Sequence, residues 1–266
     1  MAKLLEKIIK LEIASIKCGS KSEALEFGLR FSNSTVPDRY SDNYTLFIKQ
    51  LSDLEISRKI ENEISARVNS GKTFCKLVFL HKIQNKIIEL PNYACTTDKV
   101  NYMSLDLTSK IDISGNTDCN IVHAVDDATI SDGVKAHVLA NAPSQTEDFA
   151  RRNILSMVDI CKNPKLGYNF FVCYHKGNPI GKFLLFQLGD MTWLYDFDIL
   201  PDYQNNGFGT QCLAWMVDYC RNQQCRYLAL VAMDAENAKF LYSRCGFEYI
   251  GQRVEVFYDL KNPKTA

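Results

Sequence analysis

The clearest hydrophobic pattern in this chain of 266 residues lies in its second half. Three apolar segments of strand length follow one another, joined by the short turns KGN and GD. Segments with helical spacing flank them. Strands are predicted at 119–125, 170–175, 179–188, 191–200, 226–232, 246–250 and 254–260, and helices at 131–142, 145–163, 209–223 and 235–245. This order predicts an α/β (α+β) fold with a mixed sheet flanked by helices.

The first half has a weaker pattern. Residues 52–71 predict a helix that begins with a capping box at Ser52 and Glu55 and ends at Gly71. Extended segments are predicted at 25–32, 44–50, 74–80 and 100–107. The polar stretch 112–120 is the best domain boundary. We therefore expect a smaller helper lobe at 1–115 and a second domain at 119–262.

The two halves share an order of elements. Residues 77–107 overlay residues 230–260 without a gap when the chain is shifted by 153 positions. Identities are few, so the repeat depends on the order of elements, and any strand, helix, strand series can be overlaid in this way. The first half is either a degenerate copy of the second or an unrelated helper domain.

The amino-acid composition of the chain limits the kinds of binding partner that it can have. Thirty-one basic residues balance thirty-one acidic ones, which argues against nucleic acid or an anionic membrane as a partner. No apolar run is long enough to cross a bilayer and the first residues lack a signal-peptide core, so we expect a cytoplasmic protein. Ten cysteines without a C-x-x-C pair and four scattered histidines predict reduced thiols and no metal site.

Residues 201–210, PDYQNNGFGT, stand between a predicted strand and a predicted helix. The first N–H groups of a helix have no partner inside it, and the helix dipole adds partial positive charge, so an anion is favoured there. Gly207 and Gly209 permit a positive φ and remove Cβ atoms that would keep a diphosphate at a distance. Alone, two glycines are equally consistent with an ordinary turn.

The surrounding sequence resembles the GNAT superfamily of acyl-CoA-dependent N-acyltransferases. Its signature, (Q/R)-x-x-G-x-(G/A) between the fourth strand and the third helix, matches this position, and a later helix commonly carries Ala-x-x-x-Tyr followed by Gly-Phe. The matching residues are Gln204, Gly207, Gly209, Ala238, Tyr242, Gly246 and Phe247. The resemblance covers residues 119–260 and implies a mixed, mostly antiparallel sheet with acetyl-CoA as cosubstrate.

The resemblance also implies roles for single residues. Backbone N–H groups would bind the diphosphate of coenzyme A, and the backbone near Ile199 and Leu200 would pair with the pantetheine arm where the fourth strand splays from the fifth. The family often has Asn seven residues before the Tyr; this chain has Ala235 there, with Asn237 nearby. The implied diphosphate residues are Gln204, Asn205, Asn206, Gly207, Phe208, Gly209 and Thr210.

Asp196 and Asp198 are the candidate bases. An alkyl ammonium of pKa about 10.4 costs roughly 4.6 kcal/mol to deprotonate at pH 7, so an amine acceptor benefits from a base. Two positions apart in a strand, the carboxylates face one side, and they could equally bind a backbone group or a cationic substrate without moving a proton. The resemblance implies that Tyr242 protonates the departing thiolate; the alternative is a core tyrosine.

When the two halves are aligned with a shift of 153 positions, the glutamine and glycines of the loop correspond to Leu51, Leu54 and Ile56. Tyr242 corresponds to Glu89. A helix start without glycines cannot approach a diphosphate closely, so the first lobe is not expected to bind coenzyme A. It would instead shape the acceptor site, with the polar and aromatic segment 31–44 as a candidate acceptor-side loop.

Three functions follow. The first is transfer of an acetyl group from acetyl-CoA to a primary amine of a small molecule or peptide, by direct attack in a ternary complex. The second is transfer of a longer acyl chain, and the third is a non-catalytic protein that senses acyl-CoA. The sequence identifies neither the acceptor nor the oligomeric state.

Overall fold

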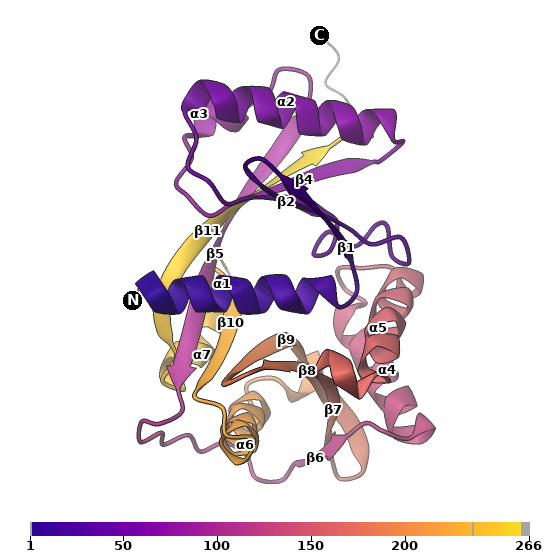
Figure 1. Cartoon of the computed structure of the whole chain (residues 1–266). Coiled ribbons are helices and arrows are strands. Elements are labelled where there is room, and N and C mark those ends of the chain that lie inside the picture. The colour runs from indigo at the N-terminus through magenta and orange to yellow at the C-terminus, as the bar shows by residue number, and fades with distance from the viewer. Residues whose placement is uncertain (1, 236, 262–266) are drawn as a thin grey trace. The chain divides into compact units, whose positions relative to one another are not determined.

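The computed structural model describes residues 2–235 and 237–261 (Figure 1). Contacts divide them into two compact units, each built from separate stretches of chain. Unit 1 contains residues 2–19, 103–230 and 237–250, and unit 2 contains residues 20–102, 231–235 and 251–261. No described helix has the length and apolar character needed to cross a membrane.

Unit 1 carries most of the sheet predicted in the second half. Strands β6 to β9 pair antiparallel in chain order, and β10 pairs parallel with β9. The predicted mixed, mostly antiparallel sheet flanked by helices is therefore confirmed. Its elements are α1 (Ala2–Lys17), β6 (Asn120–His123), α4 (Asp127–Asn141), α5 (Glu147–Cys161), η1 (Pro164–Leu166), β7 (Tyr168–His175), β8 (Asn178–Leu188), β9 (Met191–Ile199), η2 (Pro201–Tyr203), α6 (Phe208–Asn222), the start of β10 (Tyr227–Met233) and α7 (Ala238–Arg244).

Helices α4 and α6 cover opposite faces of these strands. A Cβ at Gly133 of α4 would lie 2.4 Å from the ring of Phe170, so the helix packs tightly on that side chain. The neighbouring ring of Phe171 lies 5.0 Å from Trp215 and 5.1 Å from Tyr219, both on α6. Because successive strand residues point to opposite faces, the two helices enclose the strands from both sides.

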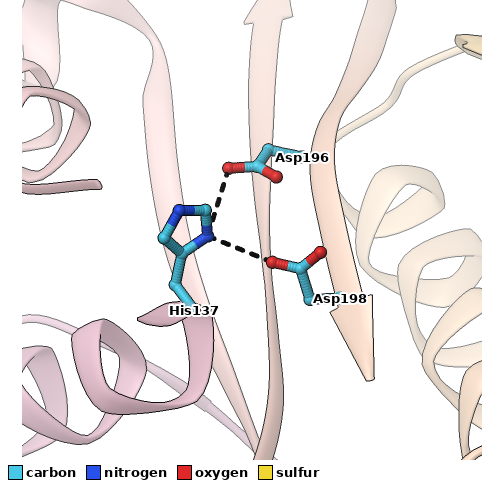
Figure 2. A group of neighbouring side chains, drawn as sticks. All are labelled: His137, Asp196 and Asp198. Carbon is cyan, nitrogen blue, oxygen red and sulfur yellow. Dashed lines mark hydrogen bonds and ion pairs between the residues drawn. The ribbon is translucent and has the colours of Figure 1, made fainter. Parts of the chain in front are cut away.

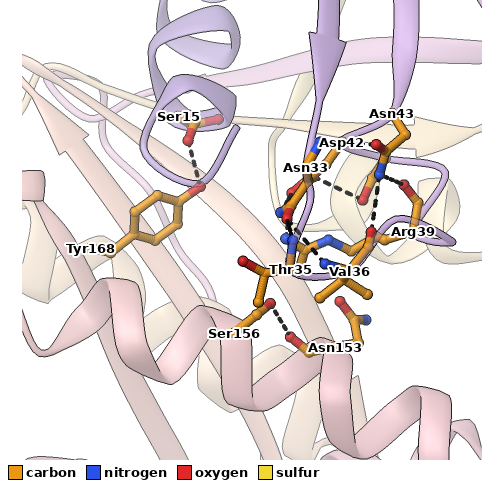
Figure 3. Close-up of polar contacts among 11 residues, drawn as sticks. Ser15, Asn33, Thr35, Val36, Arg39, Asp42, Asn43, Asn153, Ser156 and Tyr168 are labelled. Atoms are coloured by element: carbon orange, nitrogen blue, oxygen red, sulfur yellow. Dashed lines mark hydrogen bonds and ion pairs between the residues drawn. The ribbon is translucent and has the colours of Figure 1, made fainter. Parts of the chain in front are cut away.

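The first helix, α1, was not predicted from the sequence, where these residues were considered only as a leader. Its Ile8, Leu11 and Ile16 are buried, at the spacing of one helix face. The hydroxyl of Tyr168 on β7 donates to the carbonyl of Ser15 at 3.5 Å (Figure 3). Helix α1 is therefore part of the core of unit 1.

Unit 2 contains its own sheet. Strands β1, β2 and β3 pair antiparallel, β3 pairs parallel with β4, and β4 pairs antiparallel with β11. Ile60 and Ile64 of α2 pack in one cluster with Leu77 and Tyr258. The elements are β1 (Lys21–Leu25), β2 (Gly28–Ser32), β3 (Tyr44–Phe47), α2 (Asp53–Asn69), β4 (Phe74–Phe79), α3 (Asn85–Ile88) and most of β5 (Ala94–Asp106) and β11 (Glu248–Asp259).

Two predicted strand patterns are wrong. The segment 25–32, expected as one extended stretch, holds the turn of the β1–β2 hairpin, and Gly28 lies so close to the carbonyl of Leu46 that a Cβ would come within 1.8 Å of its oxygen. The segments 246–250 and 254–260 were expected as separate strands, but β11 runs through both. No Pro or Asn-Gly turn signal interrupts residues 251–253, and the strand continues.

The register of 153 residues relates the observed elements. Phe74 and Tyr227 begin β4 and β10, and Asn85 and Ala238 begin α3 and α7, each pair 153 positions apart. The division into a helper lobe at 1–115 and a second domain at 119–262 stays a prediction. Residue 262, the expected domain end, and Glu236, inside the helix expected at 235–245, lie outside the described residues.

Candidate functional site

Strand β9 separates from β10 at the place where the sequence predicts the donor site. The two strands pair from Met191–Tyr227 to Trp193–Ala229. Strand β9 continues to Ile199 along β8, and among the described strands β10 does not follow it. Since a main chain without a neighbouring strand keeps free hydrogen-bonding groups, the second half of β9 can pair with an extended ligand.

The loop after β9 brings an uncapped helix start to this opening. Asn205 and Gly207 adopt left-handed conformations, with φ of 60° and 81°, which Asn and Gly tolerate best. Gly207 is the N-cap of α6 and has no side chain to accept from the first N–H groups. The N–H groups of Phe208, Gly209 and Thr210 therefore have no partner within the helix.

The carbonyl side of this loop is held by a neighbouring segment. The N–H of Asn116 donates to the carbonyl of Gly207 at 3.1 Å, and its side-chain amide donates to the carbonyl of Asn206 at 3.1 Å. Gly115 packs so tightly that a Cβ would lie 2.3 Å from the nitrogen of Gln211. Asn116 was not predicted as a site residue, and its contact, 90 residues away in sequence, is visible only in the fold.

Of the other predicted donor residues, Ile199 and Leu200 adjoin this loop, and Asn237 begins another helix. Ile199 accepts from the side-chain amide of Gln204 at 2.8 Å, and Leu200 donates to the carbonyl of Ile180 at 2.8 Å. One lone pair of the Ile199 carbonyl is thus already engaged. Asn237 is the exposed N-cap of α7, and its side chain makes no capping bond.

Helix α7, which carries Tyr242, packs beside the start of α6. A Cβ added at Gly209 would be in ordinary contact, at 3.5 Å, with the side chain of Leu241. Tyr242, the next residue, is 9% exposed, and its ring lies 5.6 Å from that of Phe247. The fold therefore brings the helix with the tyrosine next to the helix with the bare N–H groups.

Asp196 and Asp198 share a buried cation on the α4 side of the strands. The ammonium of Lys182 on β8 lies 2.7 Å from a carboxylate oxygen of Asp196 and 2.9 Å from one of Asp198. It also donates to the backbone carbonyl of Asp196 at 2.7 Å, which engages all three of its N–H groups. Lys182 is fully buried, and both carboxylates keep some exposure.

A bulge in β9 makes this arrangement. The pairing of β8 with β9 shifts register between Lys182 and Leu184, and Asp196 has a φ of 54°. Left-handed backbone at a residue other than Gly costs free energy, less at Asp than at most residues, and neighbouring contacts stabilise it. Lys182 binds both the backbone carbonyl and the carboxylate of Asp196, and these two contacts stabilise the bulge.

His137 of α4 completes the cluster (Figure 2). Its Nδ1 lies 3.1 Å from Asp198 and 3.6 Å from Asp196, and the amide of Asn141 donates to Asp198 at 3.2 Å. Burial opposes the charge of Asp198, but Lys182 and His137 outweigh it and hold the pKa of this carboxyl well below its usual range. Asp198 is a carboxylate at neutral pH.

The same cluster resembles a metal site only in its ligand types. His137, Asp196 and Asp198 offer ligand atoms within 4.8 Å of one another. The ammonium of Lys182, however, already lies between the two carboxylates. A divalent cation there would face a fixed positive charge, so the donor set does not fit a metal, and the expectation of a metal-free site stays a prediction.

The candidate acceptor-side loop at 31–44 belongs to unit 2 and is held by its own polar side chains (Figure 3). Asn43 accepts from the N–H of Asn33 at 2.9 Å and donates to the carbonyls of Val36 and Arg39 at 3.0 and 2.9 Å. Arg39 pairs with Asp42. The loop is ordered by internal hydrogen bonds; its role at an acceptor site stays a prediction.

Sequence reasoning missed Lys182 and His137. Lys182 lies in an apolar strand, where an isolated lysine usually faces solvent, and His137 lies in a helix without a clear polar face. The alternation of β8 does place Lys182 on the face opposite Phe183. That signal becomes informative only once α4 is known to cover this face.

Comparisons with known proteins agree with this geometry. Residues 139–247 match the model of the Acetyltransferase (GNAT) family. A functionally unknown conserved protein from Staphylococcus epidermidis superposes with a TM-score of 0.75 at 17% identity, over 91% of this chain and 94% of that one. A GCN5-related N-acetyltransferase from Kribbella flavida gives 0.64 at 10% identity, over 94% of both chains. No curated protein matches the chain.

A tandem GNAT protein from the clavulanic acid biosynthesis pathway is also similar in fold, with a TM-score of 0.52 at 11% identity over 89% of this chain and 76% of that protein. Fold and family model together define a protein of the GNAT fold. The chain contains a GNAT acetyltransferase domain at residues 139–247. Members of this family take an acyl group from acyl-CoA.

Proposed function

We propose that this protein is an N-acetyltransferase that moves an acetyl group from acetyl-CoA to a primary amine of a small molecule or peptide, by direct attack in a ternary complex. The observation that carries the proposal is the start of α6, where Gly207 leaves the first N–H groups uncapped beside the opening between β9 and β10. This is the geometry that an extended ligand with a diphosphate requires.

The donor is proposed to lie along the second half of β9. The N–H groups of Gln204 to Thr210 bind the diphosphate, and the free edge of β9 near Ile199 and Leu200 pairs with the pantetheine amides. A charge-assisted hydrogen bond contributes about 1.5 to 3 kcal/mol, so a few converging N–H groups hold a diphosphate without Lys or Arg. Asn237 is proposed as a further side chain that binds the donor.

The acid cluster is proposed to attract the amine. Two carboxylates and one ammonium leave a net negative charge when His137 is neutral, and this charge favours an ammonium acceptor. Asp198, with its lowered pKa, is a weak base. Asp198 is therefore proposed to hold the acceptor in place, and Asp196 is the remaining candidate base.

Tyr242 is proposed to return a proton to the thiolate of coenzyme A. Its helix packs beside Gly209, next to the proposed donor site, and a phenol keeps its proton at pH 7. General acid catalysis contributes about 10²- to 10⁴-fold. Tyr242→Phe retains the ring that packs on Phe247 and removes only the hydroxyl.

The test is release of free coenzyme A from acetyl-CoA in the presence of a panel of primary amines. We expect turnover with at least one amine, and a kcat about 100-fold lower in Tyr242→Phe with KM for acetyl-CoA nearly unchanged. Equal kcat in the variant contradicts the role of Tyr242. Longer acyl-CoA donors in the same assay separate acetyl transfer from transfer of longer chains.

A protein that senses acyl-CoA without turnover is the remaining alternative. It predicts tight binding of acetyl-CoA and no release of coenzyme A with any amine. Binding measured by calorimetry beside the thiol assay separates this result from failure of the donor site itself.

A further inference from the structure

Three cysteines that the proposed reaction does not use lie together in unit 1. Ile121 on β6 is directly opposite Cys173 on β7, so both side chains point to the same face of the sheet. Cys119 is two positions before Ile121 and shares that face. Cys119 is the residue before β6, and its thiol lies near enough to that of Cys173 for the two to interact.

Helix α6 adds the third thiol. The ring of Phe208 lies 4.9 Å from His175, and Trp215 lies 5.0 Å from Phe171. His175, Cys173 and Phe171 alternate along one face of β7, so Cys212, between the two anchored helix residues, lies over Cys173. Cys173 and Cys212 are fully buried.

Cys119 is the accessible member. It is only partly buried, whereas Cys173 and Cys212 have no exposure to solvent. Hydrogen bonds from the thiol of Cys212 outweigh partial burial and, with a smaller contribution from Cys173, lower the pKa of Cys119 to about 7. A substantial fraction of this thiol is ionised at neutral pH, and the thiolate is the nucleophilic form.

We propose that Cys119 and Cys212 form a peroxide-sensitive thiol pair in which Cys119 is oxidised first and Cys212 closes a disulfide. Among the described residues, the one group of potential metal ligands converging within 4.8 Å is His137 with Asp196 and Asp198. The three sulfurs do not all lie within that distance of one another, so they do not form a site for a metal.

The chemistry needs one molecule of peroxide. The thiolate of Cys119 attacks a peroxide oxygen, the O–O bond breaks, and the leaving hydroxide takes a proton to become water, which leaves a sulfenic acid. The sulfur of Cys212 then attacks the sulfur of Cys119. The S–S bond forms, the S–O bond breaks, and hydroxide combines with the thiol proton of Cys212 as a second water. Two thiols are oxidised and one peroxide is reduced.

The neighbouring thiols also set the order of the two steps. Hydrogen bonding and charge from Cys119 and Cys173 raise the pKa of Cys212 well above its usual value. Cys212 therefore stays protonated while Cys119 is a thiolate. Conversion of Cys119 to a neutral sulfenic acid removes the nearest negative charge, so Cys212 becomes easier to ionise and can attack.

The segments that carry Cys119 and Cys212 both contact the proposed diphosphate site. The expected effect on that site rests on the proposed function. Asn116, three residues before Cys119, holds the carbonyls of Asn206 and Gly207, while Cys212 is in the second turn of α6. A disulfide shortens the separation of two sulfurs to about 2.05 Å. It would draw segment 115–119 further onto the first turn of α6, where Gly115 already packs without spare room.

The test oxidises the reduced full-length protein with limiting hydrogen peroxide and maps the cysteines by mass spectrometry. We expect a cross-linked peptide joining Cys119 to Cys212, reversed by dithiothreitol. In Cys212→Ser we expect a sulfenic acid at Cys119 that dimedone traps. Cys161→Ser is the matched control, because Cys161 is also half-buried but burial raises its pKa to about 12; it should oxidise as the unsubstituted protein does.

Binding of coenzyme A to the reduced and oxidised proteins gives the second readout. We expect about tenfold weaker binding after oxidation, equivalent to loss of one hydrogen bond to the diphosphate. Oxidation of other cysteines before Cys119, or a Cys119–Cys173 bridge, overturns the thiol pair. An unchanged affinity overturns its connection to the loop. Absence of coenzyme A binding in the reduced protein contradicts the proposed function, while the mapped disulfide decides the thiol pair separately.

Discussion

Helices α2 and α6 occupy equivalent places in the two halves of the chain, but their first turns differ. At the start of α2, Ser52 accepts from the N–H of Glu55, and the carboxylate of Glu55 accepts from the N–H of Ser52 at 2.9 Å. At the start of α6, Gly207 caps with no side chain, and the first turn contains no acid. The first turn of α2 contains its own anion, the carboxylate of Glu55. The first turn of α6 contains no anion, so its N–H groups can bind one from a ligand.

The strands that precede these two helices also differ in how their polar side chains are bonded. In the register of 153 residues, Leu29 and Thr45 correspond to Lys182 and Asp198. Thr45 is fully buried and donates to Glu63 at 2.6 Å, whereas Asp198 shares the ammonium of Lys182 and remains partly exposed. The polar side chain in the first half is buried in an internal hydrogen bond, and its counterpart in the second half remains partly exposed.

The largest expected effect comes from breaking the acid cluster of the second half. Lys182→Met leaves Asp196 and Asp198 without their buried cation, and we expect the free energy of unfolding to fall by about 3 kcal/mol, the lower end for a buried pair because both carboxylates touch solvent. Urea unfolding measures this change. Lys162→Met is the control, since its pair with Asp159 is exposed and should cost less than about 1 kcal/mol.

The next effect comes from giving α6 the anion that α2 already has. In Gly209→Glu a carboxylate enters the first turn of α6, where it suits the helix dipole and meets Leu241 at an ordinary contact distance. We expect coenzyme A to bind about 100-fold more weakly, equivalent to one or two charge-assisted hydrogen bonds. Gly209→Gln has nearly the same shape without the charge; an equal loss in that variant would attribute the effect to bulk alone.

The helix starts were readable from the sequence because their signals are local. The capping box at Ser52 and Glu55 and the glycines at 207 and 209 each determine the backbone within one turn. The strands of the second half up to β10 were placed to within a few residues for the same reason, whereas the last two predicted strands are one. Fold class and the proposed donor loop therefore followed from short stretches of chain.

The acid cluster was only half predictable. Asp196 and Asp198 were named from one strand, but their partners Lys182 and His137 come from β8 and α4. The bulge at Asp196 falls inside an apolar strand pattern, and its contacts with Lys182 come from the neighbouring strand. Asn116 likewise acts through backbone carbonyls 90 positions away. Contacts between distant segments depend on how the elements pack. The pattern of residues within one short stretch does not determine that packing.

A smaller effect is expected from removing the cap of α2. Ser52→Ala takes away the acceptor for the N–H of Glu55, and loss of such a cap typically costs about 1 kcal/mol. Urea unfolding should show this loss, while coenzyme A affinity stays unchanged because α2 is not the proposed site. Weaker coenzyme A binding in Ser52→Ala would show that the two helix starts are not divided in function as proposed.

The smallest effect concerns pH. Hydrogen bonds from the hydroxyl and the N–H of Ser52 lower the pKa of Glu55 below its usual value. A carboxyl with a lowered pKa in the folded protein contributes stability above its unfolded pKa of about 4.3, and that contribution is lost as pH falls through the folded pKa. In Glu55→Gln the side-chain amide can still accept the capping hydrogen bond, but it does not titrate. Between about pH 5 and 3 this variant should therefore lose slightly less stability than the unsubstituted protein. Parallel acid titrations of both proteins, followed by circular dichroism, measure the difference.

Identical titrations would mean that α2 gains nothing from its own carboxylate, and the contrast with α6 would then rest on the glycines alone.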